Sequence, residues 1–112
     1  MNEQEVFDKV VNHLLKQNKK AAKFPSPYRS ECMYKNSEGL KCAIGCLIPD
    51  DKYQPYMENM RSDEILNEIG LGKLNINFID ELQKTHDHFM VREWGERLKH
   101  IAEKFNLVYR AK

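Results

Sequence analysis

Five side chains of this 112-residue sequence have the chemistry that catalytic and metal sites use: Cys32, Cys42, Cys46, His86 and Asp87. Thiolates and imidazole nitrogens are ligands that zinc prefers, so the three cysteines and His86 form a candidate set of four. However, the sequence contains no Cys-x-x-Cys pair, and the spacing of the cysteines does not match the common zinc domains. We therefore expect no metal, and this set of four stays a weak alternative.

A thiol nucleophile is the second kind of chemistry that these residues suggest. Cys42 follows a glycine turn and can open a helical segment, whose N-terminal amides would stabilise a thiolate. His86 would then serve as the general base. Asp87 is its neighbour on a predicted helix, where successive side chains diverge by about 100°. Asp87 is thus expected to be poorly placed to orient the imidazole, and Cys42 and His86 are the only catalytic candidates.

The third interpretation assigns these residues to the core. Free cysteine is among the most buried residue types. His86 falls on a helix face shared with Ile79, Leu82 and Phe89, where a histidine that donates one hydrogen bond can be buried. We favour this interpretation and expect no cofactor.

Four lysines follow the predicted end of the first helix: Lys16, Lys19, Lys20 and Lys23. Cations interact favourably with the C-terminal end of a helix dipole, so they require no ligand. They also form a weak candidate patch for phosphate or nucleic acid, although no aromatic residue alternates with them to stack on bases. The net charge of +1 is too small to produce a strong electrostatic field that would attract nucleic acid.

Composition indicates a globular chain and one domain, residues 1–112. The hydrophobic fraction is 41% and the charged fraction is 31%, which argues against global disorder. No run approaches the length of a membrane span, and the acidic N-terminus does not resemble a signal peptide. Three cysteines within one short segment favour a reducing compartment. We expect a cytoplasmic protein without membrane contact.

The first half of the chain predicts one helix and one hairpin. Residues 3–17 carry an apolar stripe with helical period, and Asn2 and Glu5 form a capping pair. Residues 24–28 contain two prolines and are expected to be extended. A hairpin is predicted from residues 32–35 and 40–42 around a glycine-containing turn, which would bring Cys32 close to Cys42. Residues 42–48 are ambiguous, and we favour one or two buried helical turns over a strand.

The second half predicts helices. A short irregular helix follows Asp50, and its tyrosines and methionines are expected in the core: Tyr53, Tyr56, Met57 and Met60. Another helix begins near Ser62 and ends at Gly70. A third is capped by Asn75 or Asn77, and the last carries an apolar stripe from Val91 through Trp94 to Phe105. The predicted fold is therefore α+β, a mainly helical compact domain of four to five helices with one small β-hairpin.

Several short motifs resemble those of a group of small phage and prophage proteins. Their signature is Cys-x-Tyr, followed by Gly-x-Lys-Cys-Ala-Ile/Val-Gly-x-Leu-Ile-Pro-Asp, and here these motifs span Cys32–Tyr34 and Gly39–Asp50. Further similar positions follow: Tyr53, Leu82, Gln83, His86, Asp87, Trp94 and Leu98. The resemblance implies an accessory protein that acts in a bacterial host cytoplasm, and it supplies no catalytic residues.

These observations together predict a non-enzymatic binding module. Its expected partner is a protein of the host, of a host defence or of the phage, with nucleic acid as a weaker alternative. The competing function is a small thiol-dependent enzyme that uses Cys42 and His86.

Overall fold

The computed structural model describes residues 1–23 and 32–111. These residues contain four α-helices and three 3-10 helices: α1 (Glu3–Gln17), η1 (Gly45–Leu47), η2 (Pro55–Asn59), α2 (Ser62–Glu68), α3 (Ile76–His88), η3 (Val91–Glu93) and α4 (Trp94–Lys104). The extended segment predicted for residues 24–28 lies outside the described residues.

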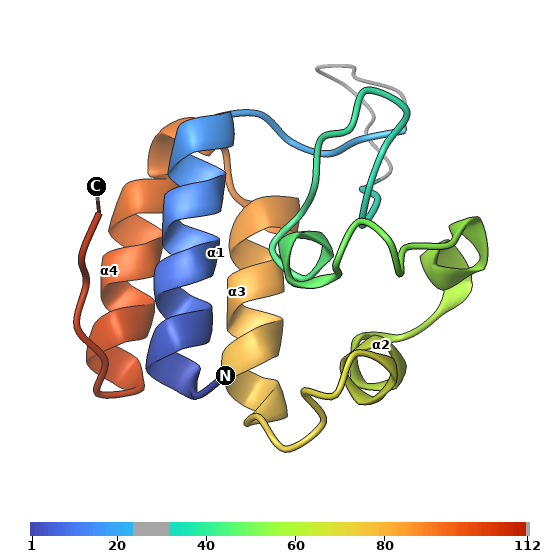
Figure 1. Ribbon diagram of the computed structural model, residues 1–112. Coiled ribbons are helices and arrows are strands. Elements are labelled where there is room, and N and C mark those ends of the chain that lie inside the picture. Colours follow the sequence, from blue (N-terminus) through green and yellow to red (C-terminus); the bar gives the residue numbers. More distant parts are fainter. Residues whose placement is uncertain (24–31, 112) are drawn as a thin grey trace.

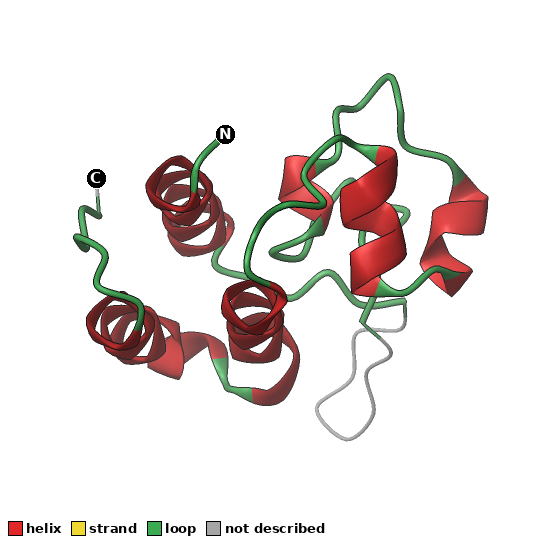
Figure 2. Cartoon of the chain, turned by 90° about the horizontal axis from the view of Figure 1, so that it is seen from below, coloured by secondary structure: helices red, strands yellow, loops and turns green. Residues whose placement is uncertain are grey.

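Helices α1, α3 and α4 form a three-helix bundle. They lie side by side in Figure 1, with α1 and α3 parallel and α4 antiparallel to both, and seen from below they form a triangle (Figure 2). The ring of Phe78 on α3 links the bundle. Its centroid lies 6.3 Å from that of Phe7 on α1 and 5.5 Å from that of Phe105 at the end of α4. Trp94 is completely buried, as predicted from the stripe of the last helix.

Helix α1 begins and ends where the sequence predicts. The Asn2 side chain accepts a hydrogen bond from Glu5 N, and the Glu5 carboxylate accepts one from Asn2 N, which completes a capping box. Asn18 adopts a left-handed conformation with φ of 53° and ends the helix. The apolar stripe is buried: Val6, Phe7, Val10, Val11 and Leu14.

The remaining helical segments form a second part beside α3. Figures 1 and 2 both place η1, η2 and α2 on the side of α3 that faces away from α4. The predicted helical interpretation of residues 42–48 is confirmed as a single 3-10 turn, η1. Gly45 in this turn lies against the backbone of Tyr34, so closely that an added Cβ would be 1.8 Å from the Tyr34 carbonyl oxygen. Only glycine fits there.

The predicted fold class, α+β with one small β-hairpin, is wrong. The described part of the chain has no strand, only two isolated antiparallel bridges, Ala22 with Cys32 and Lys35 with Lys41. The reason is that side chains, not a second strand, accept most of the hydrogen bonds from this backbone.

Two of the three side chains that replace a strand ladder, Glu58 and Gln17, come from distant parts of the sequence. The Glu58 carboxylate accepts hydrogen bonds from Tyr34 N at 3.0 Å and Lys35 N at 3.2 Å. Gln17 on α1 accepts one from Lys41 N at 2.9 Å. Asn36 Oδ1 accepts a further hydrogen bond from Leu40 N within the turn. Because these side chains accept hydrogen bonds from the backbone N–H groups, the segment can be buried without the hydrogen bonds of a β-ladder.

The segment after Asp50 is the short irregular helix that the sequence predicts, but only part of it is buried. Pro55 opens η2, and Met57 lies in the core with 2% exposure. Tyr56 was also expected in the core, and that prediction is wrong, because its side chain is 55% exposed. The two positions are adjacent in a 3-10 helix, where successive side chains diverge by about 120°, so one can be buried while the other is exposed.

Candidate functional site

His86 is the centre of the candidate site. It lies near the end of α3, is fully buried, and stacks on Trp94 with ring centroids 5.5 Å apart. Its Nε2 accepts a hydrogen bond from Ala21 N at 2.9 Å, so the neutral ring carries its proton on Nδ1. Nδ1 donates that proton to Asp87 Oδ1 at 2.7 Å. Both imidazole nitrogens are therefore engaged within the protein.

The expectation that Asp87 is poorly placed to orient His86 is wrong. The divergence of about 100° applies to the Cα–Cβ directions of neighbouring helical residues. Beyond Cβ, the imidazole and the carboxylate turn toward each other, and the hydrogen bond of 2.7 Å joins them directly. Burial of the ring makes this contact favourable, because a buried donor without a partner is costly.

Asp87 is held by more than its neighbour. Gln83, one turn earlier on α3, donates from Nε2 to Asp87 Oδ1 at 2.9 Å, and the thiol of Cys32 also hydrogen-bonds to the Asp87 side chain. Burial alone would raise the pKa of Asp87, but the hydrogen bonds from His86 and Gln83 outweigh it and hold that pKa below its ordinary value. The carboxylate is thus ionised at neutral pH.

The same network ties three distant segments to α3. Ala21 N donates to His86, Cys32 bonds to Asp87, and Ile44 N donates to Gln83 Oε1 at 3.0 Å. The interpretation of His86 as a core histidine that donates one hydrogen bond agrees with this geometry.

Cys42 and Cys46 are buried and bonded to their own turn. Cys42 has no exposed surface, and its Sγ accepts a hydrogen bond from Gly45 N at 3.2 Å. Burial raises the pKa of Cys42 far above its ordinary value, and burial raises that of Cys46 to about 12. Cys46 Sγ donates to Ala43 O at 3.0 Å. Neither sulfur is presented to solvent as a thiolate.

The four residues of the weak zinc alternative, Cys32, Cys42, Cys46 and His86, do not form one cluster of ligand atoms. Within residues 1–23 and 32–111, the only group of three potential metal-ligating side chains is Cys32, His86 and Asp87, whose ligand atoms lie within 4.8 Å of one another. Cys42 and Cys46 do not belong to it. The group contains Asp87, which the sequence did not suggest as a ligand.

Cys32 and Asp87 open onto a small polar cavity. Its volume is about 200 Å³, and its walls are formed by Cys32, Met33, Tyr34, Glu58, Ser62, Gln83 and Asp87. Burial and the neighbouring Asp87 carboxylate raise the pKa of Cys32 to about 11, so this thiol is protonated at neutral pH. The cavity therefore presents two carboxylates and one protonated thiol.

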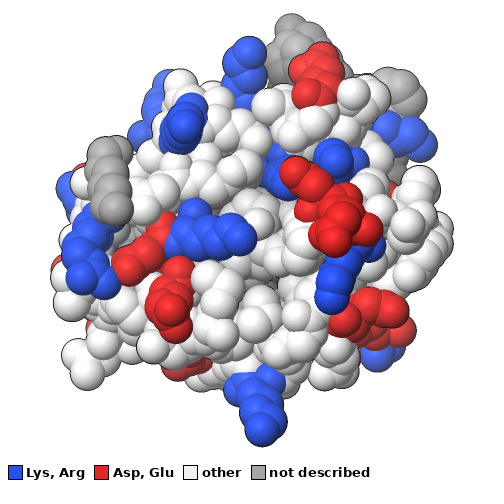
Figure 3. Space-filling model, in the orientation of Figure 1, with Lys and Arg blue, Asp and Glu red and all other residues white. Residues whose placement is uncertain are grey.

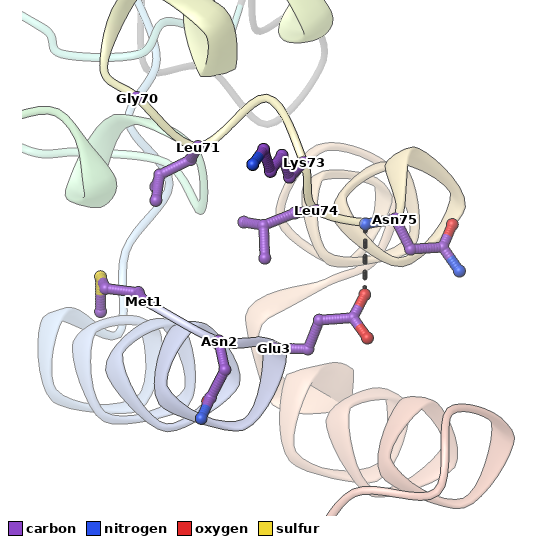
Figure 4. A pocket seen from close by; sticks show the side chains of 8 residues that line it. All are labelled: Met1, Asn2, Glu3, Gly70, Leu71, Lys73, Leu74 and Asn75. Carbon is purple, nitrogen blue, oxygen red and sulfur yellow. Dashed lines mark hydrogen bonds between the residues drawn. The ribbon is translucent and has the colours of Figure 1, made fainter.

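A larger groove lies at the other end of the bundle, between the start of α1 and the loop from α2 to α3. Figure 4 shows Leu71 and Leu74 directed into the groove, with Lys73 on its rim. Its volume is about 700 Å³. Glu3 crosses one side and accepts a hydrogen bond from Asn75 N at 3.2 Å.

The four lysines of the weak candidate patch differ in their exposure and in their contacts. Lys16, Lys19 and Lys23 are exposed, whereas Lys20 is partly buried and donates from Nζ to the backbone oxygen of Asp87 at 3.3 Å. On the face shown in Figure 3, basic and acidic side chains are interspersed. The mixture of charges on this face does not support binding of nucleic acid.

Comparisons with protein-family models, with curated proteins and with solved structures found no match. No helix among residues 1–23 and 32–111 combines the length and the apolar character that a membrane span requires.

Sequence reasoning missed two residues of the site, Gln83 and Glu58. The contact of Gln83 with Asp87 could have been predicted from the sequence, because glutamine and aspartate four residues apart on a helix can form a hydrogen bond. Glu58 had none, since it contacts Tyr34 and Lys35, more than 20 positions earlier, through its side chain alone.

Proposed function

We propose that this protein is a non-enzymatic binding module, a phage or prophage accessory protein that acts on a protein of the bacterial host or of its defences in the cytoplasm. The resemblance in residues 32–50 supports the phage assignment. The use of that segment in the fold supports the non-enzymatic class, because its cysteines and amides bond to the protein itself.

The observation that carries the proposal is the hydrogen bonding of His86. A thiol-dependent enzyme needs a base with a free nitrogen and a thiol that a substrate can reach. Here Nε2 is taken by Ala21 N and Nδ1 by Asp87, and Cys42 has no exposed surface. The competing function through Cys42 and His86 therefore has no support from the geometry.

The surface that we assign to binding is the groove of Figure 4. Its occupant is proposed to be a segment of a partner protein that inserts an apolar side chain between Leu71 and Leu74 and places a carboxylate beside Lys73. The cation of Lys73 argues for this occupant. Glu3 and Lys73 both line the groove, and the Glu3 carboxylate accepts a hydrogen bond from Asn75 N. No ion pair involving Lys73 occurs among the described residues, so its ammonium group is available to a carboxylate of the partner.

Affinity capture from host lysate, followed by reconstitution with the purified partner, tests this function. We expect a stoichiometric complex that Lys73→Glu weakens by about tenfold, because a repulsive contact replaces an attractive one. Lys52→Glu is the matched control, since Lys52 is exposed and lies outside the groove.

Two results would contradict the proposal. If both charge reversals leave the affinity unchanged, the groove is not the binding surface. If the partner is covalently altered in a manner that depends on Cys42, the protein is an enzyme.

A further inference from the structure

We propose that the polar cavity beside Cys32 and Asp87 is an exchangeable site for a thiophilic divalent cation such as Zn²⁺, bound through Cys32 Sγ and the Asp87 carboxylate. This inference is independent of the groove and of the proposed function.

The geometry of the ligand atoms carries the proposal. Cys32 Sγ and an Asp87 oxygen belong to the cluster whose ligand atoms lie within 4.8 Å of one another, and both residues line the cavity. The hydrogen bonds from His86 and Gln83 both end on Asp87 Oδ1. They fix the carboxylate in place, and neither uses Oδ2, which we assign to the cation.

His86 acts as a positioning residue and does not bind the cation. Its Nδ1 carries a proton because Nε2 accepts from Ala21 N. Coordination through Nδ1 would move that proton to Nε2, where two N–H groups would face each other. A carboxylate ligand held by an outer hydrogen bond is a common feature of metal sites, and here His86 and Gln83 supply it.

The charge of the cavity also favours a cation. Asp87 and Glu58 stand on its walls, and neither forms an ion pair with lysine or arginine within the described ranges 1–23 and 32–111. Lys20 opposes a cation there, because its Nζ donates to the backbone oxygen of Asp87 and its charge also acts on Cys32. With about 30 Å³ per water, the 200 Å³ cavity has room for the waters that complete the coordination.

The binding step is a simple exchange of a proton for a cation. At neutral pH the Cys32 thiol is protonated, so its S–H bond breaks as the bond from sulfur to the metal forms, and one proton leaves to solvent. Asp87 is already ionised and releases none. No oxidation or reduction takes place.

The test is a Cd²⁺ titration of the full, reduced chain, followed by the ultraviolet charge-transfer absorption of a cadmium-bound thiolate. We expect one Cd²⁺ per chain and the release of one proton, measured by calorimetry in buffers of different ionisation enthalpy. Cys32→Ser should abolish the absorption. Cys46→Ser is the matched control and should retain it, because serine can keep the hydrogen bond to Ala43 O.

Two further variants separate this site from a general effect on folding. Asp87→Asn should weaken Cd²⁺ binding by about tenfold or more, because it removes a charged ligand and the loss of an outer partner alone costs about that much. Lys20→Gln should tighten it by roughly two- to fivefold, since it removes a nearby positive charge. A merely structural role for Lys20 would not produce tighter binding.

The proposal fails if no absorption develops at millimolar Cd²⁺. It also fails if the absorption persists in Cys32→Ser, which would assign it to Cys42 or Cys46, or if Lys20→Gln weakens binding.

Discussion

Replacement of Gly45 by alanine tests the packing of the cysteine-rich turn against the segment before it. The new Cβ would lie 1.8 Å from the carbonyl oxygen of Tyr34 and 2.7 Å from its carbonyl carbon, whereas real Cβ atoms essentially never approach within 3.0 Å. Both atoms belong to the backbone, so no side-chain rotation relieves the clash. The two segments must move apart.

The size of the effect follows from what that movement disrupts. Forcing an additional methyl group into a packed site costs about 1–3 kcal/mol. The Tyr34 carbonyl also accepts a hydrogen bond from Cys42 N at 3.3 Å, and its loss adds about 0.5–1.5 kcal/mol. We therefore expect Gly45→Ala to lower the free energy of unfolding by about 2–4 kcal/mol. For a chain of this size, that lowers the melting temperature by roughly 10–20 °C.

Gly95→Ala is the matched control. Gly95 lies in the first turn of α4, and a Cβ added there meets no atom within 4 Å. Alanine is a better helix former than glycine by up to about 1 kcal/mol, so this variant should be neutral or slightly more stable than the parent. Urea unfolding followed by circular dichroism measures both variants on one scale.

The two alanine variants are expected to change the free energy of unfolding differently, so the comparison tests the packing directly. A Gly45→Ala variant that unfolds at the same urea concentration as the parent would refute the close approach of η1 to Tyr34. A Gly95→Ala variant that is equally destabilised would show that the assay reports alanine substitution in general.

Three further predictions concern the core and the dependence on pH. Trp94→Ala should cost about 3–5 kcal/mol, because the buried indole and its hydrogen bond to Phe89 O are lost, and a nearly normal melting temperature would contradict this. Cys42 should resist alkylation in the native protein and react only after unfolding, as mass spectrometry of the labelled chain can measure, and rapid native labelling that His86→Ala slows would support the enzyme instead. Burial lowers the pKa of His13 from 6.5, with only partial opposition from its hydrogen bond to Lys41 O, so the unfolded chain takes up its proton first and stability should fall as the pH drops below about 6.5. His13→Gln should reduce that fall in the urea midpoint, and an unchanged slope would exclude His13 as its source.

The helices were predictable because their signals are local. The capping pair of Asn2 and Glu5 and the stripe beginning at Val6 are separated by only a few residues, and they define α1 without reference to the rest of the fold. The same holds for Asn75 at the start of α3 and for the buried position of Trp94. In each case the pattern and the tertiary packing agree.

The hairpin and the candidate site were not predictable from local patterns. Residues 32–35 and 40–42 have the composition of short strands, but Glu58 and Gln17 accept hydrogen bonds that a partner strand would otherwise take. Likewise, Cys32 meets Asp87 across 55 positions of sequence, and no spacing rule reports such a contact. The periodicity of a short segment indicates which faces are apolar, but it does not indicate which distant side chain satisfies the backbone.

The packing of α1 against α4 has a consequence for the synthesis of the protein. Residues 94–104, which pack against α1, are added roughly 5–15 s after residues 3–17 at ordinary rates of translation. During that interval the part of α1 that packs against α4 lacks this partner. Transiently exposed apolar surface makes a chain prone to aggregation, which chaperones counteract, so we expect the yield of folded protein to depend on chaperone supply more strongly than its small size suggests.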